Sequence, residues 1–102
     1  MLELRPICEN CATGLPPASS EARICSYECT FCRSCVETVL ENVCPNCGGG
    51  FVPRPVRPAE EWRAGVSLSA QPASTEKKHH PVKPDDQRTL VARVGDIPPA
   101  AR

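Results

Sequence analysis

The stretch Cys8–Cys47 reads CENCATGLPPASSEARICSYECTFCRSCVETVLENVCPNC and holds all eight cysteines of the 102-residue chain. Most gaps between neighbouring cysteines are two residues long, which is typical of tight turns whose two thiolates face one metal ion. A disulfide across so short a gap is strained, so the spacing favours metal over disulfide bonds. The sequence therefore predicts that every cysteine is a metal ligand: Cys8, Cys11, Cys25, Cys29, Cys32, Cys35, Cys44 and Cys47.

Eight thiolates fill two four-coordinate sites and leave no position open for a catalytic water. We therefore expect two structural Zn2+ ions, no catalytic residue, no small-molecule substrate and no enzyme activity. The spacing alone leaves the ligand grouping open. The cysteine pairs either alternate between the two ions, or the first four bind one ion and the last four bind the other. The sequential form includes ribbon-like and rubredoxin-like sites, whose knuckles iron also uses.

Local patterns place these cysteines on short elements. Apolar residues at positions 36, 39, 40 and 43 form the stripe of a short amphipathic helix that follows Cys35. Ser34 and Glu37 have the spacing of a capping box at the start of this helix. Residues 22–31 are expected to form a short hairpin. The expected core is small and consists of Leu4, Ile7, Leu15, Ile24, Phe31, Val36, Val39, Leu40, Val43 and Phe51.

Composition divides the chain into two regions. Residues 1–57 are expected to form the two-metal module, whose thin apolar core needs the metal as a staple. Residues 58–102 contain no cysteine, six prolines and charged residues without a regular period. Such a segment buries too little apolar surface to offset its ordering entropy. We expect it to be a Pro-rich, largely disordered tail, with at most a helical turn at 60–64 and a brief helix or strand at 88–94.

Charge and hydropathy indicate which classes of partner the protein can bind. The whole chain is formally neutral, while the region up to Cys47 has three basic and six acidic side chains. Zinc tetrathiolate centres add further negative charge, so the module does not offer phosphate a basic face, and we rank nucleic-acid binding low. No apolar run is long enough to span a bilayer, and no secretory signal peptide opens the chain. We expect a cytoplasmic protein that binds other proteins and no membrane.

The ligand order resembles that of the RING finger and its treble-clef relatives. The resemblance lies in four cysteine pairs, a helix after the third pair, the stretch Cys29-Thr-Phe-Cys32-Arg-Ser-Cys35-Val36 and the closing Cys44-Pro-Asn-Cys47. It implies a small metal-stapled α+β fold with one short helix. It also implies a cross-brace, in which one zinc is bound by Cys8, Cys11, Cys32 and Cys35 and the other by Cys25, Cys29, Cys44 and Cys47.

A narrower resemblance covers residues 1–58. The opening Leu2-Glu-Leu-Arg-Pro6, the step Arg23-Ile-Cys25 and the stretch from Cys44 to Pro58 are similar to a bacterial family of small eight-cysteine proteins without a known function. At the positions where RING ligases dock a ubiquitin-conjugating enzyme, this chain has Glu9-Asn10, an apolar stripe needed for the core, and Gly48. We therefore expect a protein-interaction module, keep a redox-responsive zinc-thiolate switch as the alternative, and rank ligase activity low.

Overall fold

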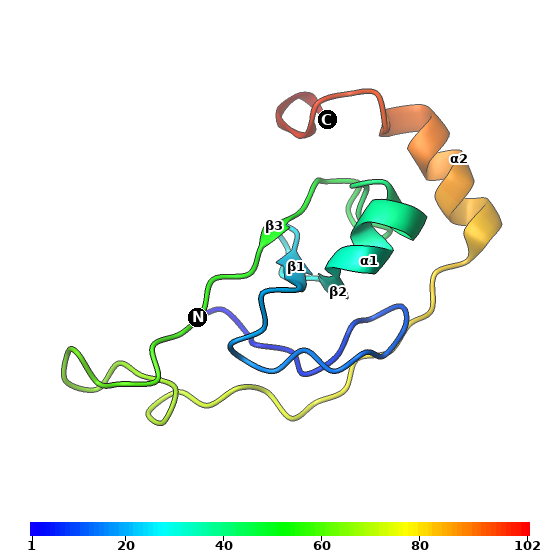
Figure 1. Cartoon of the computed structure of the whole chain (residues 1–102). Coiled ribbons are helices and arrows are strands. Elements are labelled where there is room, and N and C mark those ends of the chain that lie inside the picture. Colours follow the sequence, from blue (N-terminus) through cyan, green and yellow to red (C-terminus); the bar gives the residue numbers. More distant parts are fainter.

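The computed structural model describes residues 1–102, and a three-stranded antiparallel sheet forms its centre (Figure 1). Strand β1 (Ala22–Ile24) pairs with β2 (Thr30–Cys32) so that Ala22 faces Cys32. On its other side β1 pairs with β3 (Val52–Pro53), which gives the strand order β2-β1-β3. The predicted hairpin is confirmed. It places Cys25 and Cys29 in the loop between its strands and Cys32 at the end of β2.

The predicted helix after the third cysteine pair is present, but it begins earlier and is capped differently. It consists of α1 (Arg33–Cys35), which continues directly into η1 (Val36–Leu40), a segment with the wider π-helical winding. Its N-cap is Cys32, whose Sγ accepts a bond from the backbone N–H of Cys35 at 3.5 Å. The capping box of Ser34 and Glu37 was therefore wrong. A cysteine at the end of β2 performs this role because the strand runs straight into the helix.

Cysteine contributes almost half of the apolar interior. Six of the thirteen buried apolar residues are cysteines. Phe31 provides the largest buried side chain and meets Phe51 edge to face, with ring centroids 5.5 Å apart. Of the predicted core, six residues are buried and three are half-buried, while Val39 is 41% exposed because the helix turns it towards solvent. The buried six are Leu4, Leu15, Phe31, Val36, Leu40 and Val43.

The C-terminal segment differs from the largely disordered tail that was expected. It contains the eleven-residue helix α2 (Pro84–Val94) and the short helix η2 (Pro99–Ala101), so the chain has more than one short helix. The single buried residue of α2 is the polar Gln87, whose Nε2 donates to the carbonyls of Leu40 at 3.1 Å and Val43 at 2.9 Å. The helix thus docks through the hydrogen bonds of Gln87. It has no buried apolar stripe that a hydropathy pattern would reveal. Residues 60–64 form turns and no helix.

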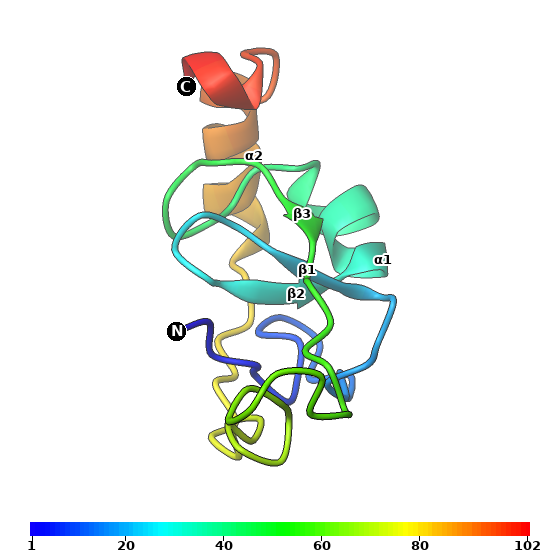
Figure 2. The ribbon, with the colours of Figure 1, turned by 90° about the vertical axis from the view of Figure 1, so that its left-hand side faces the viewer.

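Before α2, residues 74–82 run along the N-terminal segment, and we call these residues the strap. In Figure 1 the helix of α1 and η1 lies between the sheet and α2, and Figure 2 shows the strap rising from the N-terminal loops to α2. The N–H of Ser74 donates to Leu4 O at 3.0 Å, and the N–H of His80 donates to Glu9 O at 2.7 Å. These bonds join the strap to the stretch that carries the first two cysteines. None of the helices is long and apolar enough to cross a membrane.

Two arginines after β3 anchor the same region. Arg54 is buried, and its guanidinium donates to three backbone carbonyls of the N-terminal segment, those of Arg5, Leu15 and Pro16. Burial without a carboxylate partner lowers the pKa of Arg54. Arg57 donates in the same way to the carbonyls of Leu2 and Gln71. The proline-rich stretch after β3 therefore fastens the N-terminal cysteine pair to the sheet.

Candidate metal centres

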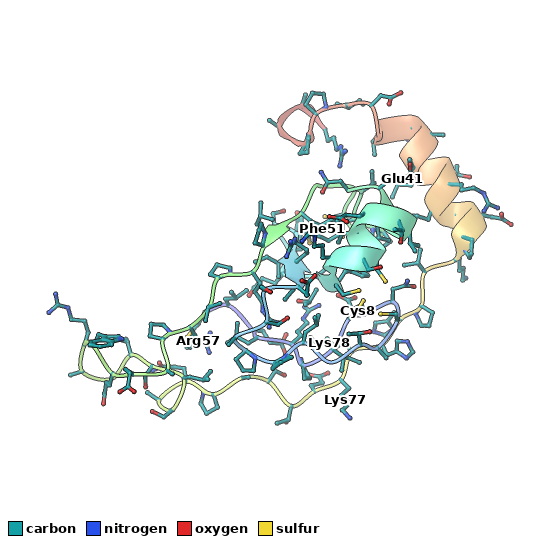
Figure 3. All side chains as sticks on the ribbon, in the orientation of Figure 1. Cys8, Glu41, Phe51, Arg57, Lys77 and Lys78 are labelled. Atoms are coloured by element: carbon teal, nitrogen blue, oxygen red, sulfur yellow. The ribbon has the colours of Figure 1, made fainter.

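The first cluster brings together cysteines from two stretches that lie far apart in the sequence. The Sγ atoms of four cysteines all lie within 4.8 Å of one another: Cys8, Cys11, Cys32 and Cys35. The first two belong to the N-terminal knuckle, a turn that spans residues 8–11, while Cys32 ends β2 and Cys35 ends α1. Figure 3 shows Cys8 just beneath the helix that follows β2. The grouping is the interleaved one, because the cysteines at positions 25 and 29 lie elsewhere.

The spacing of these sulfur atoms fits a tetrahedral metal ion. Four sulfurs at about 2.3 Å from one ion lie about 3.8 Å from each other. The Sγ atoms of Cys11 and Cys32 are 3.7 Å apart, which matches such an edge and is far too long for a disulfide bond. All eight cysteines of the chain are free thiols. The donor set is therefore suited to a tetrathiolate metal centre.

The second cluster is less tightly gathered. The Sγ atoms of Cys25, Cys44 and Cys47 lie within 4.8 Å of one another, and Cys29 lies outside that group. Burial raises the pKa of Cys29, the hydrogen bond from Asn46 lowers it, and the neighbouring thiol of Cys25 raises it again. Cys29 is therefore close to this cluster, and together these four residues form a second set of thiols that can hold a metal ion.

The two knuckles have the same backbone design. In the first, Ala12 has a φ of 64° and its N–H donates to the carbonyl of Cys8 at 3.0 Å. In the second, which spans residues 44–47, Gly48 has a φ of 77° and donates to the carbonyl of Cys44 at 2.8 Å. A left-handed residue after the second cysteine closes each turn. Glycine adopts this conformation without strain, whereas alanine does so at a cost of about 1 kcal/mol.

Backbone N–H groups already point at several of the sulfurs. Tyr27 N donates to Cys25 Sγ at 3.3 Å, and Gly49 N donates to Cys47 Sγ at 3.4 Å. Such bonds favour the thiolate, which is the form that binds metal. In the knuckle at 44–47, the N–H of Gly49 thus lies close to the sulfur of Cys47.

Individual thiols differ in acidity, even within one cluster. Burial works against ionisation of Cys11, but bonds with the hydroxyl and backbone of Thr13 outweigh it and lower the pKa to about 6. Burial raises the pKa of Cys35 and of Cys44 well above the ordinary value for a thiol. A metal ion that binds these buried thiols must displace their protons, which makes metal uptake dependent on pH.

Sequence reasoning missed three residues that hold the clusters together. The side-chain amide of Asn10 donates to Cys35 Sγ at 3.3 Å, and that of Asn46 donates to Cys29 Sγ at 3.4 Å. Glu9 is 4% exposed, and its carboxylate accepts from Arg5, from the N–H of Thr30 and, at 3.5 Å, from Asn46. The repeated pattern Cys-x-Asn-Cys at 8–11 and 44–47 was the sequence signal that could have identified the two asparagines.

The comparisons with known proteins give one relative and one family. The uncharacterized protein R02474 of Rhizobium meliloti (strain 1021) is 56% identical over 75 residues, which cover 74% of this chain and 82% of that protein. This alignment is longer than the module, so it reaches into the C-terminal segment. No solved structure gives a significant match. The model of a family described as a protein of unknown function (DUF1272) matches residues 1–57, and the chain therefore belongs to the DUF1272 family.

Proposed function

We propose that this protein is a small zinc-binding module in which two structural Zn2+ ions hold the fold together and the surface binds another protein. The observation that carries the metal part is the gathering of four sulfurs within 4.8 Å from two distant stretches of the chain, residues 8–11 and 32–35. Four sulfurs at the spacing of a tetrahedral centre form a donor set that suits Zn2+. Six buried cysteines stand where a larger domain would place aliphatic residues, so the metal supplies folding free energy that the apolar core lacks.

The arrangement supports a RING-like or treble-clef cross-brace. The first and third cysteine pairs share one cluster, and a helix begins directly after Cys32. The hairpin of β1 and β2 carries ligands of both clusters, because Cys32 at its end belongs to the first and Cys25 at its turn belongs to the second. In this proposal each ion is bound by four cysteines, with Cys29 completing the second site.

Zinc is the proposed metal because it takes four thiolates in a tetrahedron and needs no redox partner. Its role here is to cross-link the chain, and the residues around it position the sulfurs and exclude water. With all four positions filled by protein, neither site has room for a catalytic water, so the proposal includes no enzyme activity. Thiolates of this kind persist in reducing compartments, and the proposal therefore includes a cytoplasmic location.

The interaction role is supported by exposed aromatic side chains. Trp62 is 78% exposed on the protruding loop 58–72, and Tyr27 is 74% exposed at the turn of the hairpin (Figure 1). Tryptophan and tyrosine are enriched at the energetic centres of protein interfaces. By contrast, Glu9 and Asn10, at the positions where RING ligases dock their partner enzyme, are used in internal hydrogen bonds. The proposal therefore does not include ubiquitin-ligase activity.

The metal part is tested by native mass spectrometry of freshly purified protein, with elemental analysis of the bound metal. We expect two zinc ions per chain and eight reduced cysteines. One metal ion, iron in place of zinc, or oxidised cysteine pairs would overturn it.

The interaction part is tested by chemical cross-linking and capture on the immobilised full chain, with Trp62→Ala and Arg63→Ala compared with the wild type. We expect a defined protein to be retained by the wild type and by Arg63→Ala, and to be lost with Trp62→Ala. Recovery of nucleic acid without protein, abolished when Lys77 and Lys78 are changed to alanine, would contradict the interaction role.

A redox-responsive switch is the second candidate, favoured by one observation. Each cluster contains one exposed thiol, Cys11 in the first and Cys47 in the second, while the other cysteines are buried. Peroxide can oxidise two thiolates of one cluster to a disulfide while it is itself reduced to water, and the cluster then releases its zinc. This candidate predicts reversible zinc release at low peroxide concentration. Zinc that stays bound until the chain unfolds would exclude it.

A further inference from the structure

Two asparagines occupy equivalent places in the two knuckles. Asn10 and Asn46 each stand at the third position of a Cys-x-Asn-Cys turn. Each donates its side-chain Nδ2–H across its cluster to a cysteine of another element: Asn10 to Cys35 at 3.3 Å, and Asn46 to Cys29 at 3.4 Å. The same residue at the same place makes the same bond twice, although the other non-cysteine residue of the turn differs, Glu9 in the first and Pro45 in the second.

We propose that Asn10 and Asn46 are the positioning residues of the two metal sites, each fixing the thiolate that its own knuckle does not supply. The inference rests on the proposed metal-binding function and deepens it. A hydrogen bond to a thiolate stabilises the charged sulfur and fixes its direction, and partners of this kind tune metal affinity. The two sites thereby gain a contact that joins the knuckle to the opposite side of the cluster before metal binds.

The two asparagines are themselves held differently. Asn10 Oδ1 accepts the backbone N–H of Val82 at 2.9 Å, so the strap orients the amide that points at Cys35. Asn46 Nδ2 also lies 3.5 Å from the buried carboxylate of Glu9, which belongs to the other knuckle. The first site therefore depends on docking of the C-terminal segment, while the second depends on the first knuckle.

The contacts around Asn10 support this dependence. His79 Nε2 lies 3.1 Å from the carbonyl of Asn10, and the N–H of His80 donates to the carbonyl of the preceding residue, Glu9. In Figure 3, Lys77 and Lys78 lie on the strap below the labelled Cys8, where the strap passes the first knuckle. The strap thus contacts the backbone of the first knuckle at Glu9 and Asn10 and also the side chain of Asn10, which points at the metal site.

The test uses the full chain loaded with 113Cd, whose chemical shift reports on the sulfurs around each ion. Asn10→Leu and Asn46→Leu keep the side-chain volume and remove the donor, and each variant is the control for the other. We expect Asn10→Leu to move only the resonance that correlates with the Hβ protons of Cys8, and Asn46→Leu to move only the other. In the zinc-loaded variants, we expect the affinity of the affected site for zinc to be about 10- to 100-fold lower than in the wild type. A competing chelator measures this loss.

A second measurement does not depend on whether the variants fold. In the 113Cd-loaded wild type, the side-chain amide protons of Asn10 should show through-bond coupling to the metal of the first site, and those of Asn46 to the metal of the second. Absence of this coupling in a wild type that binds two metal ions would overturn the inference and leave two-metal binding intact. A wild type that binds no metal would overturn the proposed function instead.

The strap contact is tested with Val82→Pro, which removes the N–H that holds Asn10, and with Val82→Ala, which keeps it. We expect the proline variant to release zinc from the first site faster than the alanine variant and the second site to be unaffected. Equal release from the first site of both variants would show that the strap does not orient Asn10.

Discussion

The two sulfur clusters are built from the same parts but are not equally formed. In the first cluster all four sulfurs lie within 4.8 Å of one another, whereas in the second Cys29 lies outside the close group of three. The first contains the helix cap Cys32 and is covered by the strap, and the second has its fourth ligand in the loop between β1 and β2. The comparison indicates that the first site is preorganised for metal, while the second needs a small movement of Cys29 to close.

The largest expected effect is that of metal removal. Structural zinc contributes about 10–16 kcal/mol in small zinc domains, which is as large as the whole stability of about 5–15 kcal/mol expected for a domain of this size. We expect a chelator at neutral pH to abolish the dispersed amide spectrum of the chain and to do so in two steps, with the second site emptied first. Loss of metal from the first site before the second would show that the second site is the preorganised one. A metal-free chain that stays folded would show that metal does not hold the fold together.

Replacing one cysteine in each cluster tests whether the two clusters differ in how firmly they bind metal. Cys32→Ser removes a ligand of the preorganised site and the sulfur that caps the helix, so we expect the first ion to be lost and the protein to bind one metal. Cys29→Ser leaves the close group of Cys25, Cys44 and Cys47, so we expect two ions to bind, the second one weakly. Native mass spectrometry at a series of zinc concentrations measures both. Equal losses in the two variants would show that the clusters are equivalent.

A smaller effect is expected from Gln87, which joins α2 to the turn that leads into the second knuckle. Gln87→Ala leaves the buried carbonyl of Val43 without its donor, which costs about 1–3 kcal/mol, while the carbonyl of Leu40 keeps the N–H of Val43 at 3.0 Å. We expect a lower melting temperature at a fixed zinc concentration, measured by circular dichroism. Arg93→Ala, an exposed change on the same helix, is the matched control and should change stability little. Equal melting temperatures for Gln87→Ala and the wild type would show that α2 is not docked.

The smallest expected effect depends on pH and concerns the strap. Lys78 Nζ lies 3.2 Å from Glu3 Oε1, and its hydrogen bond, aided by those of Ser74 and Arg5, lowers the pKa of Glu3 against the opposing effect of burial. Because this pKa is lower in the folded chain, the stabilisation is present above the unfolded value and is lost as pH falls through the folded value. Hydrogen exchange of the strap amides in wild type and Glu3→Gln should differ at neutral pH and converge in acid. A constant difference would contradict the ion pair.

The features that followed from the sequence are those with a strict local pattern. The eight cysteines and their short gaps indicated metal sites, the resemblance to RING fingers implied how they group into two clusters, and residues 22–31 were expected to form the hairpin. The cap at Cys32 could not be read in this way, since its sulfur accepts the helix N–H only when the strand leads directly into the helix. Val39 fits the apolar stripe yet faces solvent, because η1 winds more widely than an α-helix.

The C-terminal segment was harder to predict for a physical reason. Its helix α2 is fixed by Gln87, a polar residue, and the strap by backbone bonds to Leu4, Glu9 and Asn10, none of which leaves a hydropathy pattern. Local helix indications were present in Pro84 at the first position and Asp85 and Asp86 in the first turn. The boundary between the expected module and tail at residue 57 stays a prediction.

The most direct test of the account is the ligand grouping in solution. In the chain loaded with 113Cd, proton–cadmium correlation spectra identify the cysteines that bind each ion. The account predicts two resonances, one correlated with the Hβ protons of Cys8, Cys11, Cys32 and Cys35 and the other with those of Cys25, Cys29, Cys44 and Cys47. A resonance that links Cys8 and Cys11 with Cys25 and Cys29, or a single resonance, would contradict it.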